Sequence, residues 1–320
     1  MNEIMKQFQA LGIIPVVKID NAKDAVPLAK ALIDGGLPVA EVTFRTEAAG
    51  EAIAQMCKAY PEMLVGAGTV LTTAQVDAAV AAGAKFIVSP GLNPKVVTYC
   101  RQIGVPIVPG VNNPSQIEQA LELGLEVVKF FPAEASGGLT MIKAMSAPYG
   151  KLMFMPTGGV NAANLKSYLD FNKILACGGS WMVKGDMINA GDFAGITALT
   201  REAVQGMLGF GIKHIGINSE NEEEARRVAD LFTRIFGFGQ LETPISYFCG
   251  KGVEVMKYDG EGRLGHIAVA TNYMNRAMAY LERNGIELDY DSVMLDEKGN
   301  IKLIYLKQDF GGFAVHLGRW

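Results

Sequence analysis

The sequence predicts an α/β fold, a (β/α)₈ TIM barrel, followed by a smaller α+β domain. From residue 12 to about 180, short β-rich runs alternate with helical stretches, and after Ala203 the chain has shorter strands and only two clear helices. Repeated strand-then-helix units require a parallel sheet, because each connection must return to the same edge. We place the boundary in a Gly-containing stretch, which gives domains 1-209 and 210-320.

Eight segments of the first domain have the composition of buried strands: GIIPVVKI, PVAEVTF, MLVGAG, KFIVSP, VPIVPG, LEVVKF, LMFMPTGG and KILACGG. The stretches between them, such as 22 to 36 and 73 to 84, show helical periodicity and end in glycine, which is typical of a left-handed C-cap. Eight units in about 200 residues match the lower size limit of a closed barrel. An open, doubly wound sheet is the alternative.

The second domain carries a weak internal repeat. KHIGIN (213 to 218), a helix and KGVEVMKYD (251 to 259) are echoed by GHIAVA (265 to 270), a helix and GGFAVHLG (311 to 318). Such self-similarity indicates one supersecondary unit used twice. We therefore expect two βαβββ-type modules.

The composition excludes several classes of protein. Of the 320 residues, 49% are hydrophobic and 19% charged, which indicates a packed core. A net charge of -4 without a basic run argues against binding to nucleic acid. The chain begins without a signal-peptide pattern and has no apolar run of about 18 residues, so we expect a cytoplasmic protein away from the membrane. The four widely spaced cysteines predict no disulfide.

Lys129 is the most informative residue of the first domain. In barrels of this kind the reactive side chains project from the carboxyl ends of strands, and Lys129 lies in the sixth strand between four apolar residues: Val127, Val128, Phe130 and Phe131. Burial disfavours the ammonium form, so we expect a free amine. Such an amine attacks a ketone to form an iminium, which weakens a nearby C–C bond. The alternative is a lysine that extends to solvent.

Three further polar residues lie at the end of the second predicted strand or follow the third. Glu41 is suited to general acid–base catalysis, although it could simply pair with Arg45 or Lys129. Arg45 offers the planar fork that matches a carboxylate, such as that of a 2-keto acid, and its alternative role is a surface salt bridge. Thr69 follows the third strand in GAGTV.

Two glycine-rich turns follow the seventh and eighth strands, PTGGV (156 to 160) and CGGSWMV (177 to 183). In barrels this region often binds phosphate through backbone N–H groups. The candidate phosphate ligands are therefore Gly158, Gly159, Gly179 and Ser180. Each pair of glycines is also explained by a tight turn alone.

Together these motifs resemble a known family. GLPVAEVTFR and GLEVVKFFPAEASGG are similar to the two signature motifs of the 2-keto-3-deoxy-6-phosphogluconate (KDPG) / 4-hydroxy-2-oxoglutarate (KHG) aldolases, and the similarity extends through GAGTVL, SPGLN, PTGGV and GGSWMV over about residues 1 to 205. The resemblance implies a class I Schiff-base aldolase, a lyase of carbohydrate metabolism. It would cleave KDPG to pyruvate and glyceraldehyde 3-phosphate, as in the Entner-Doudoroff pathway, or KHG to pyruvate and glyoxylate.

The resemblance also implies roles for individual residues. It makes Lys129 the Schiff-base lysine and Glu41 the proton-transferring residue. Two side chains would hold the pyruvate carboxylate and two would line the pocket: Arg45, Thr69, Pro90 and Phe131. It implies a homotrimer and no metal or other cofactor for the aldolase. Ser180 and the glycine pairs favour the phosphorylated substrate.

All three histidines of the chain lie in strand-like segments of the second domain. His214 and His266 open equivalent strands of the two modules, while Glu254 and His316 lie on the late strands. If the modules pack with pseudo-twofold symmetry, these four side chains converge on one divalent metal, for which zinc, manganese and iron are candidates.

The pattern KHIGIN, ARRVADLFTRIFGF, GHIAVA resembles the vicinal-oxygen-chelate superfamily, which includes glyoxalase I and extradiol dioxygenases, over about residues 212 to 320. That superfamily places metal ligands on the first and last strands of each module, and His316 departs from it because a glutamate is more usual there. Three interpretations remain open. The chain is an aldolase with an accessory ligand-binding or oligomerisation domain, a bifunctional enzyme with a metal-dependent second site, or a barrel that has become a regulator.

Overall fold

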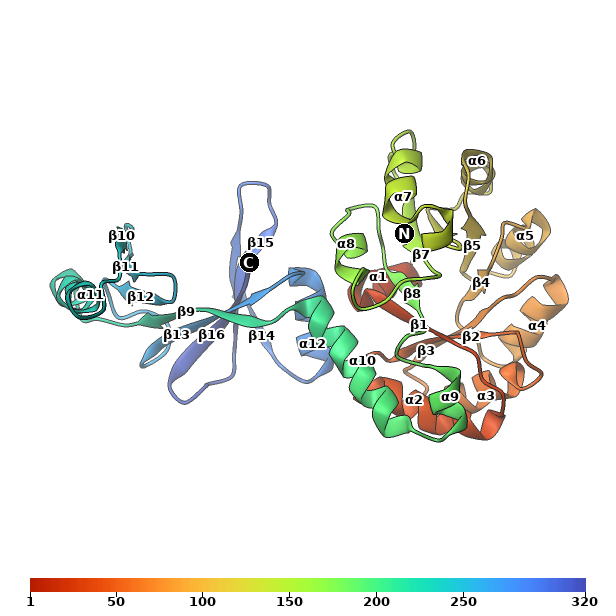
Figure 1. The fold of residues 1–320 in the computed structure, drawn as a ribbon, viewed down its shortest axis with the longest axis horizontal. Coiled ribbons are helices and arrows are strands. Elements are labelled where there is room, and N and C mark those ends of the chain that lie inside the picture. Colours follow the sequence, from red (N-terminus) through yellow and green to blue (C-terminus); the bar gives the residue numbers. More distant parts are fainter. The chain divides into compact units, whose positions relative to one another are not determined.

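A computed structural model describes all 320 residues, which form two compact units, Met1–Met207 and Leu208–Trp320 (Figure 1). The boundary falls at the end of the long helix α10 (Phe193–Leu208). The predicted boundary after residue 209 lies two residues further along the chain. Each unit contains its own eight-stranded sheet.

The first unit is a parallel barrel. Its strands follow the order β7-β6-β5-β4-β3-β2-β1-β8, and bridges from Phe154 to Ile174 and from Thr157 to Gly178 join the two ends of the sheet. This closure confirms the predicted (β/α)₈ barrel and excludes the open sheet. The strands are β1 (Ile13–Val17), β2 (Val39–Thr43), β3 (Leu64–Gly68), β4 (Ile87–Ser89), β5 (Ile107–Val111), β6 (Val127–Phe130), β7 (Met153–Pro156) and β8 (Cys177–Gly179).

Helices surround the barrel and one covers its amino-terminal end (Figure 1). In α1 (Glu3–Leu11), Asn2 caps the first turn and buried Phe8 packs edge-on against Phe86, with ring centroids 4.8 Å apart. The outer helices are α2 (Ala25–Asp34), α3 (Ala49–Ala59), α4 (Thr73–Ala81), α5 (Pro94–Gln102), α6 (Pro114–Glu122), α7 (Gly138–Ser146), α8 (Leu165–Leu169), α9 (Gly185–Asn189) and α10, with short 3-10 turns at Ala22–Asp24 and Glu134–Ser136. As predicted, left-handed glycines follow α2 and α4.

The second unit consists of two modules with the same order of elements, a strand, a helix and three strands. The first contains β9 (Gly211–Ile217), α11 (Glu222–Phe236), β10 (Gln240–Glu242), β11 (Ser246–Cys249) and β12 (Val253–Met256). The second contains β13 (Gly265–Thr271), α12 (Met274–Arg283), β14 (Leu288–Leu295), β15 (Ile301–Leu306) and β16 (Phe313–Arg319). Antiparallel pairing of β9 with β13 joins them into one mixed sheet of order β10-β11-β12-β9-β13-β16-β15-β14.

Two observations bear on the physical state of the chain. None of its helices combines the length and the apolar character needed to cross a membrane. All four cysteines are free thiols, and three of them are buried.

Candidate functional site

Two charged side chains of the first unit meet inside the barrel. Lys129 lies on β6 and Glu41 on β2, four positions apart in a ring of eight strands, so the two face each other across the interior. Both are buried, and Lys129 Nζ lies 3.3 Å from Glu41 Oε1. A lysine held in this way does not extend to solvent. The structure therefore places the amine next to a group that can accept or return its proton.

A glycine on the neighbouring strand β3 makes room for the Glu41 carboxylate. Two other glycines serve different neighbours: Gly66, which pairs with Glu41 in the register, makes room for the Phe86 ring, and Gly110, which pairs with Lys129, makes room for the Pro90 backbone. At Gly68, an added Cβ would lie only 2.3 Å from Glu41 Oε1. A larger residue at Gly68 would therefore displace the Glu41 carboxylate.

One carboxylate oxygen of Glu41 has no hydrogen-bond partner in the protein. Glu41 Oε1 contacts the ammonium of Lys129, but the buried Oε2 has no hydrogen-bond partner. Leaving a buried acceptor without a donor costs on the order of 1–3 kcal/mol, and more for a charged group. This oxygen is therefore available to a donor group on a bound molecule.

The other predicted residues of the barrel lie at the carboxyl ends of the strands, the same edge as Lys129. Phe131 is nearest, with its ring centroid 5.1 Å from Lys129 Nζ. Thr69 has a left-handed backbone, φ 57°, which is rare for a residue other than glycine and typical of functional sites. The remaining residues lie at the ends of β2, β4, β7 and β8 or just beyond them: Arg45 and Ser180, which are exposed, and Pro90, Gly158, Gly159 and Gly179, the last residue of β8.

The loop after β7 is anchored through its carbonyl groups. The Gly158 carbonyl accepts a hydrogen bond from the backbone of Glu134 at 3.0 Å. The Gly159 carbonyl accepts from the side-chain amides of Asn161 and Asn164, each at 3.1 Å. Because the carbonyl groups hold the loop, its N–H groups remain the candidate donors to an anion.

Thr157 is a further candidate that sequence reasoning missed. It is buried directly beyond β7, and its Oγ1 has no hydrogen-bond partner. An added Cβ at Gly178 would lie 2.3 Å from that oxygen, so the glycine of β8 makes room for it. The available signal was its position immediately after a strand, which it shares with Thr69.

Comparison with known proteins identifies the first unit. Residues 3–199 match the family described as KDPG and KHG aldolase. The chain belongs to this family. It is accordingly an aldehyde-lyase, an enzyme that makes or breaks a carbon–carbon bond.

Three similar proteins each match between 61% and 64% of this chain. A 2-dehydro-3-deoxy-phosphogluconate aldolase of Treponema pallidum is 51% identical over 205 residues, which are 64% of this chain and 98% of the relative. The KHG/KDPG aldolase of Escherichia coli is 43% identical over 194 residues, 61% of this chain and 91% of the relative. The crystal structure of KDPG aldolase from Legionella pneumophila, with pyruvate captured as a covalent carbinolamine intermediate, has a TM-score of 0.61 and 39% identity, covering 63% and 98% of the two chains.

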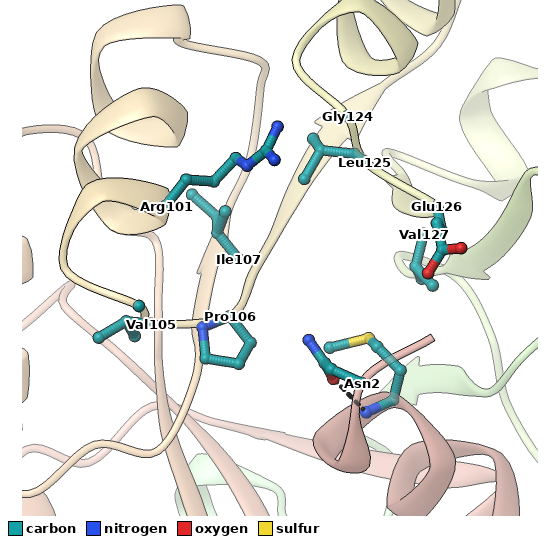
Figure 2. Close-up of a pocket in the computed structure, with 11 residues that line it drawn as sticks. Asn2, Arg101, Val105, Pro106, Ile107, Gly124, Leu125, Glu126 and Val127 are labelled. Atoms are coloured by element: carbon teal, nitrogen blue, oxygen red, sulfur yellow. Dashed lines mark hydrogen bonds between the residues drawn. The ribbon is translucent and has the colours of Figure 1, made fainter.

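A separate pocket of about 230 Å³ lies at the opposite, amino-terminal end of the aldolase barrel (Figure 2). It is lined by α1 and by the segments that lead into β5 and β6. Its two charged side chains are already engaged, since Arg101 donates to the Leu123 carbonyl and Glu126 pairs with the chain's amino terminus at 2.7 Å. Features at this end of a barrel usually serve stability.

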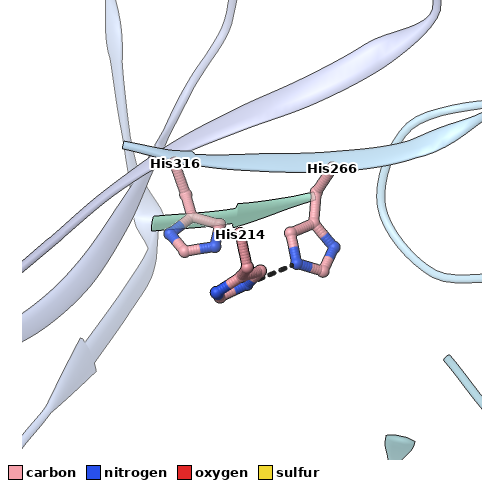
Figure 3. Close-up of side chains that lie close together, drawn as sticks. All are labelled: His214, His266 and His316. Carbon is pink, nitrogen blue, oxygen red and sulfur yellow. Dashed lines mark hydrogen bonds between the residues drawn. The ribbon is translucent and has the colours of Figure 1, made fainter. Parts of the chain in front are cut away.

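The second unit brings its three histidines together. His214 of β9, His266 of β13 and His316 of β16 converge from three strands (Figure 3), and their ligand atoms lie within 4.8 Å of one another. Nε2 of His214 and Nε2 of His266 are 3.1 Å apart. Oε2 of Glu254 lies 3.0 Å from the first and 3.4 Å from the second. All four residues singled out from the sequence therefore belong to one cluster.

The strand register explains this convergence. Glu254, Gly216 and His266 are direct neighbours across three strands, so the side chains of Glu254 and His266 meet above a glycine. An added Cβ at Gly216 would lie 2.1 Å from the His266 ring. In the adjacent row Ala268 lies between His214 and His316. One small residue thus lies between the two members of each pair, Gly216 in the first row and Ala268 in the second.

The electrostatics of the cluster suit a cation. Burial, with a contribution from His266, lowers the pKa of His316 to about 4, so this imidazole is neutral at pH 7. Burial opposes ionisation of Glu254, but hydrogen bonds from His214, His266 and Ser246 lower its pKa well below the usual range. The cluster therefore combines a carboxylate with at least one neutral imidazole, that of His316.

The first prediction concerns Gly68. In Gly68→Ala the new methyl group displaces the Glu41 carboxylate without removing any functional group, and we expect aldol cleavage to slow by up to about 100-fold, as for a catalytic group misplaced by about 1 Å. The measurement is kcat at saturating substrate, together with the unfolding temperature. Gly50→Ala on α3, where an added Cβ has no neighbour within 4 Å, is the control. Equal rates in both variants would show that Glu41 need not lie where the structure places it.

Proposed function

We propose that the first unit is a class I aldolase that cleaves a 2-keto acid through a Schiff base on Lys129. The observation that supports this most is the buried contact between Lys129 and Glu41 at the carboxyl end of the barrel. The names of the relatives, 2-dehydro-3-deoxy-phosphogluconate aldolase and KHG/KDPG aldolase, favour KDPG and KHG as substrates. The products would be pyruvate with glyceraldehyde 3-phosphate or glyoxylate.

In the first half of the reaction, Glu41 accepts a proton from the Lys129 ammonium and so leaves a neutral amine. The amine attacks the keto carbon, and the C=O π bond becomes a hydroxyl after protonation. Proton transfer from nitrogen to this hydroxyl releases water and leaves the iminium. Glu41 is close enough to serve these transfers, because its Oε1 is 3.3 Å from the nitrogen.

In the second half, Glu41 accepts the proton of the substrate hydroxyl that lies two carbons from the iminium carbon. The bond between the hydroxyl-bearing carbon and the carbon next to the iminium carbon breaks, its electron pair forms an enamine, and the aldehyde leaves. Protonation of the enamine and addition of water then release pyruvate and regenerate the amine. The unpartnered Oε2 of Glu41 is the oxygen suited to the substrate hydroxyl.

The remaining residues bind the two ends of the substrate. Arg45 and Thr69 hold the carboxylate, while Pro90 and Phe131 line the pocket. At the far end the backbone N–H groups of two glycine turns, with the Ser180 hydroxyl, receive the phosphate of KDPG: Gly158, Gly159 and Gly179. The proposal includes the homotrimer that the family resemblance implies, the cytoplasmic location expected from the sequence pattern, and no cofactor for this reaction.

The second prediction tests the nucleophile. Borohydride added with pyruvate should reduce the iminium and increase the mass of the peptide that contains Lys129, because reduction makes the bond irreversible. Lys129→Ala should lose both the label and aldol cleavage. Lys30→Ala on α2, where the ammonium pairs with Asp34 on the outside of the barrel, is the control. Labelling of any other lysine would refute the proposed nucleophile.

The third prediction tests proton transfer. Glu41→Gln keeps the shape of the side chain but cannot accept a proton, so cleavage of KDPG and KHG should slow by roughly 10²- to 10⁴-fold. Trapping with borohydride should still occur, more slowly than in the wild type. The comparison of the two substrates in wild type and variant also ranks them. Wild-type rates in Glu41→Gln would leave this residue a purely structural partner of Lys129.

We further propose that the second unit holds a divalent metal through His214, Glu254 and His266, with His316 as the fourth ligand. Two ligand atoms on a tetrahedral zinc are about 3.3 Å apart when the bonds are 2.0–2.1 Å long. The three distances among Nε2 of His214, Nε2 of His266 and Oε2 of Glu254 are 3.0, 3.1 and 3.4 Å. With His316 the spread is 4.8 Å, so its ring must move inward to bind.

The arrangement is the one expected for a domain of the vicinal-oxygen-chelate type, whose metal acts as a Lewis acid on a bound oxygen. Its two imidazoles face each other with their Nε2 atoms, which is unfavourable when both present lone pairs. A cation between them removes that repulsion. The alternative is a module that only binds a ligand or supports oligomerisation. In that case a proton on one of the two Nε2 atoms must form the hydrogen bond that holds the imidazoles together.

The fourth prediction tests the metal. Full-length protein purified without a histidine tag should contain about one divalent ion per chain, and His214→Ala and His266→Ala should lose it. Gly216→Ala, which displaces the His266 ring but keeps every ligand, should lose it as well. Gly252→Ala, where the new methyl group meets no atom within 4 Å, should retain it. A chelator should leave aldol cleavage intact. Equal metal content in all variants would identify the histidines as packing residues.

A further inference from the structure

Ser246 of β11 lies behind Glu254 and is fully buried. Its Oγ is 2.6 Å from Glu254 Oε1, the oxygen that points away from the histidines. An ionised carboxylate can only accept, so the serine hydroxyl is the donor. The two oxygens of Glu254 therefore have separate roles, one toward Ser246 and the other toward His214 and His266.

The serine is itself held in place by its surroundings. Thr243 Oγ1 lies 2.9 Å from Ser246 Oγ and accepts a hydrogen bond from the Ser246 backbone, also at 2.9 Å. On the same face of the sheet, Phe248 is the direct neighbour of Glu254 and packs edge-on against His214, with ring centroids 5.5 Å apart. Glu254 is thus fixed from two sides, and rotation of its carboxylate would break the bond to Ser246.

We propose that Ser246 is a positioning residue that holds Glu254 as a one-oxygen ligand and so keeps a coordination position open to a ligand from solution. This inference rests on the proposed metal centre. A carboxylate can bind a metal through one oxygen or both, and both oxygens would occupy an additional position. With His316 as the fourth protein ligand, a one-oxygen Glu254 leaves a fifth position for the ligand from solution, and catalytic zinc sites are known to expand to five ligands.

The test uses full-length protein loaded with Co²⁺, whose visible absorption reports coordination, and azide as the probe of the open position. In the wild type we expect azide to change the spectrum. In Ser246→Ala the affinity for Co²⁺ should fall roughly 10- to 100-fold, as for other losses of a group behind a metal ligand. At saturating Co²⁺ the spectrum of this variant should differ from that of the wild type and its response to azide should be lost, because the freed oxygen takes the open position.

Two further variants separate positioning from general stability. Ser246→Thr retains the hydroxyl and should restore the affinity and the azide response. Ser219→Ala removes a different buried serine of the same unit, located just beyond β9, and should behave as the wild type. Circular dichroism of each variant monitors the fold.

The outcomes distinguish the two levels of the proposal. Wild-type protein that fails to bind Co²⁺ would overturn the metal centre itself, and with it the role of Ser246. Binding without any response to azide would overturn the open position. Binding in Ser246→Ala with wild-type affinity and spectrum would overturn the positioning role alone.

Discussion

An ammonium and a carboxylate share the interior of a barrel whose core is mostly apolar, and the structure of the first unit follows from accommodating them. Removing two charges from water is expensive unless they pair closely. Lys129 and Glu41 satisfy this condition because they extend from opposite strands and meet at 3.3 Å. The pairing in turn requires space, which Gly68 of β3 provides beside the Glu41 carboxylate. One partner cannot be replaced alone without leaving the other as an uncompensated buried charge.

The second unit also depends on small residues that leave space for larger side chains, although its chemistry differs. A functional side chain on one strand reaches a neighbour two strands away only if the residue between them is small. Gly216 has this role between Glu254 and His266, and Ala268 has it between His214 and His316. The cluster is therefore a property of the sheet register as much as of its histidines, since a shift by one residue would turn the affected side chains to the other face.

The sequence was sufficient for those features that depend on local pattern. Alternating strands and helices predicted the barrel, and the repeat predicted two modules with the same order of elements. Lys129 was recognisable because a charge within an apolar strand is unusual, and the histidines because they recur at matching positions. Thr157 was missed although its position directly after a strand was a signal, whereas Ser246 and Gly216 were not recognisable. Their importance arises from which residue lies opposite or beside them, and neither register nor hydrogen-bond partners can be read from one chain.

Charge balance separates the two sites. Lys129 and Glu41 carry opposite charges, so this pair is neutral overall. The other cluster lacks such a balance: a buried carboxylate faces two imidazole nitrogens, and a third imidazole, His316, remains neutral at pH 7 because burial lowers its pKa to about 4. Lone pairs directed at one point are stabilised by a cation, either protons or a metal. A metal ion can bind all of these ligand atoms at once, whereas a proton is bonded to one nitrogen and shared with only one neighbouring acceptor.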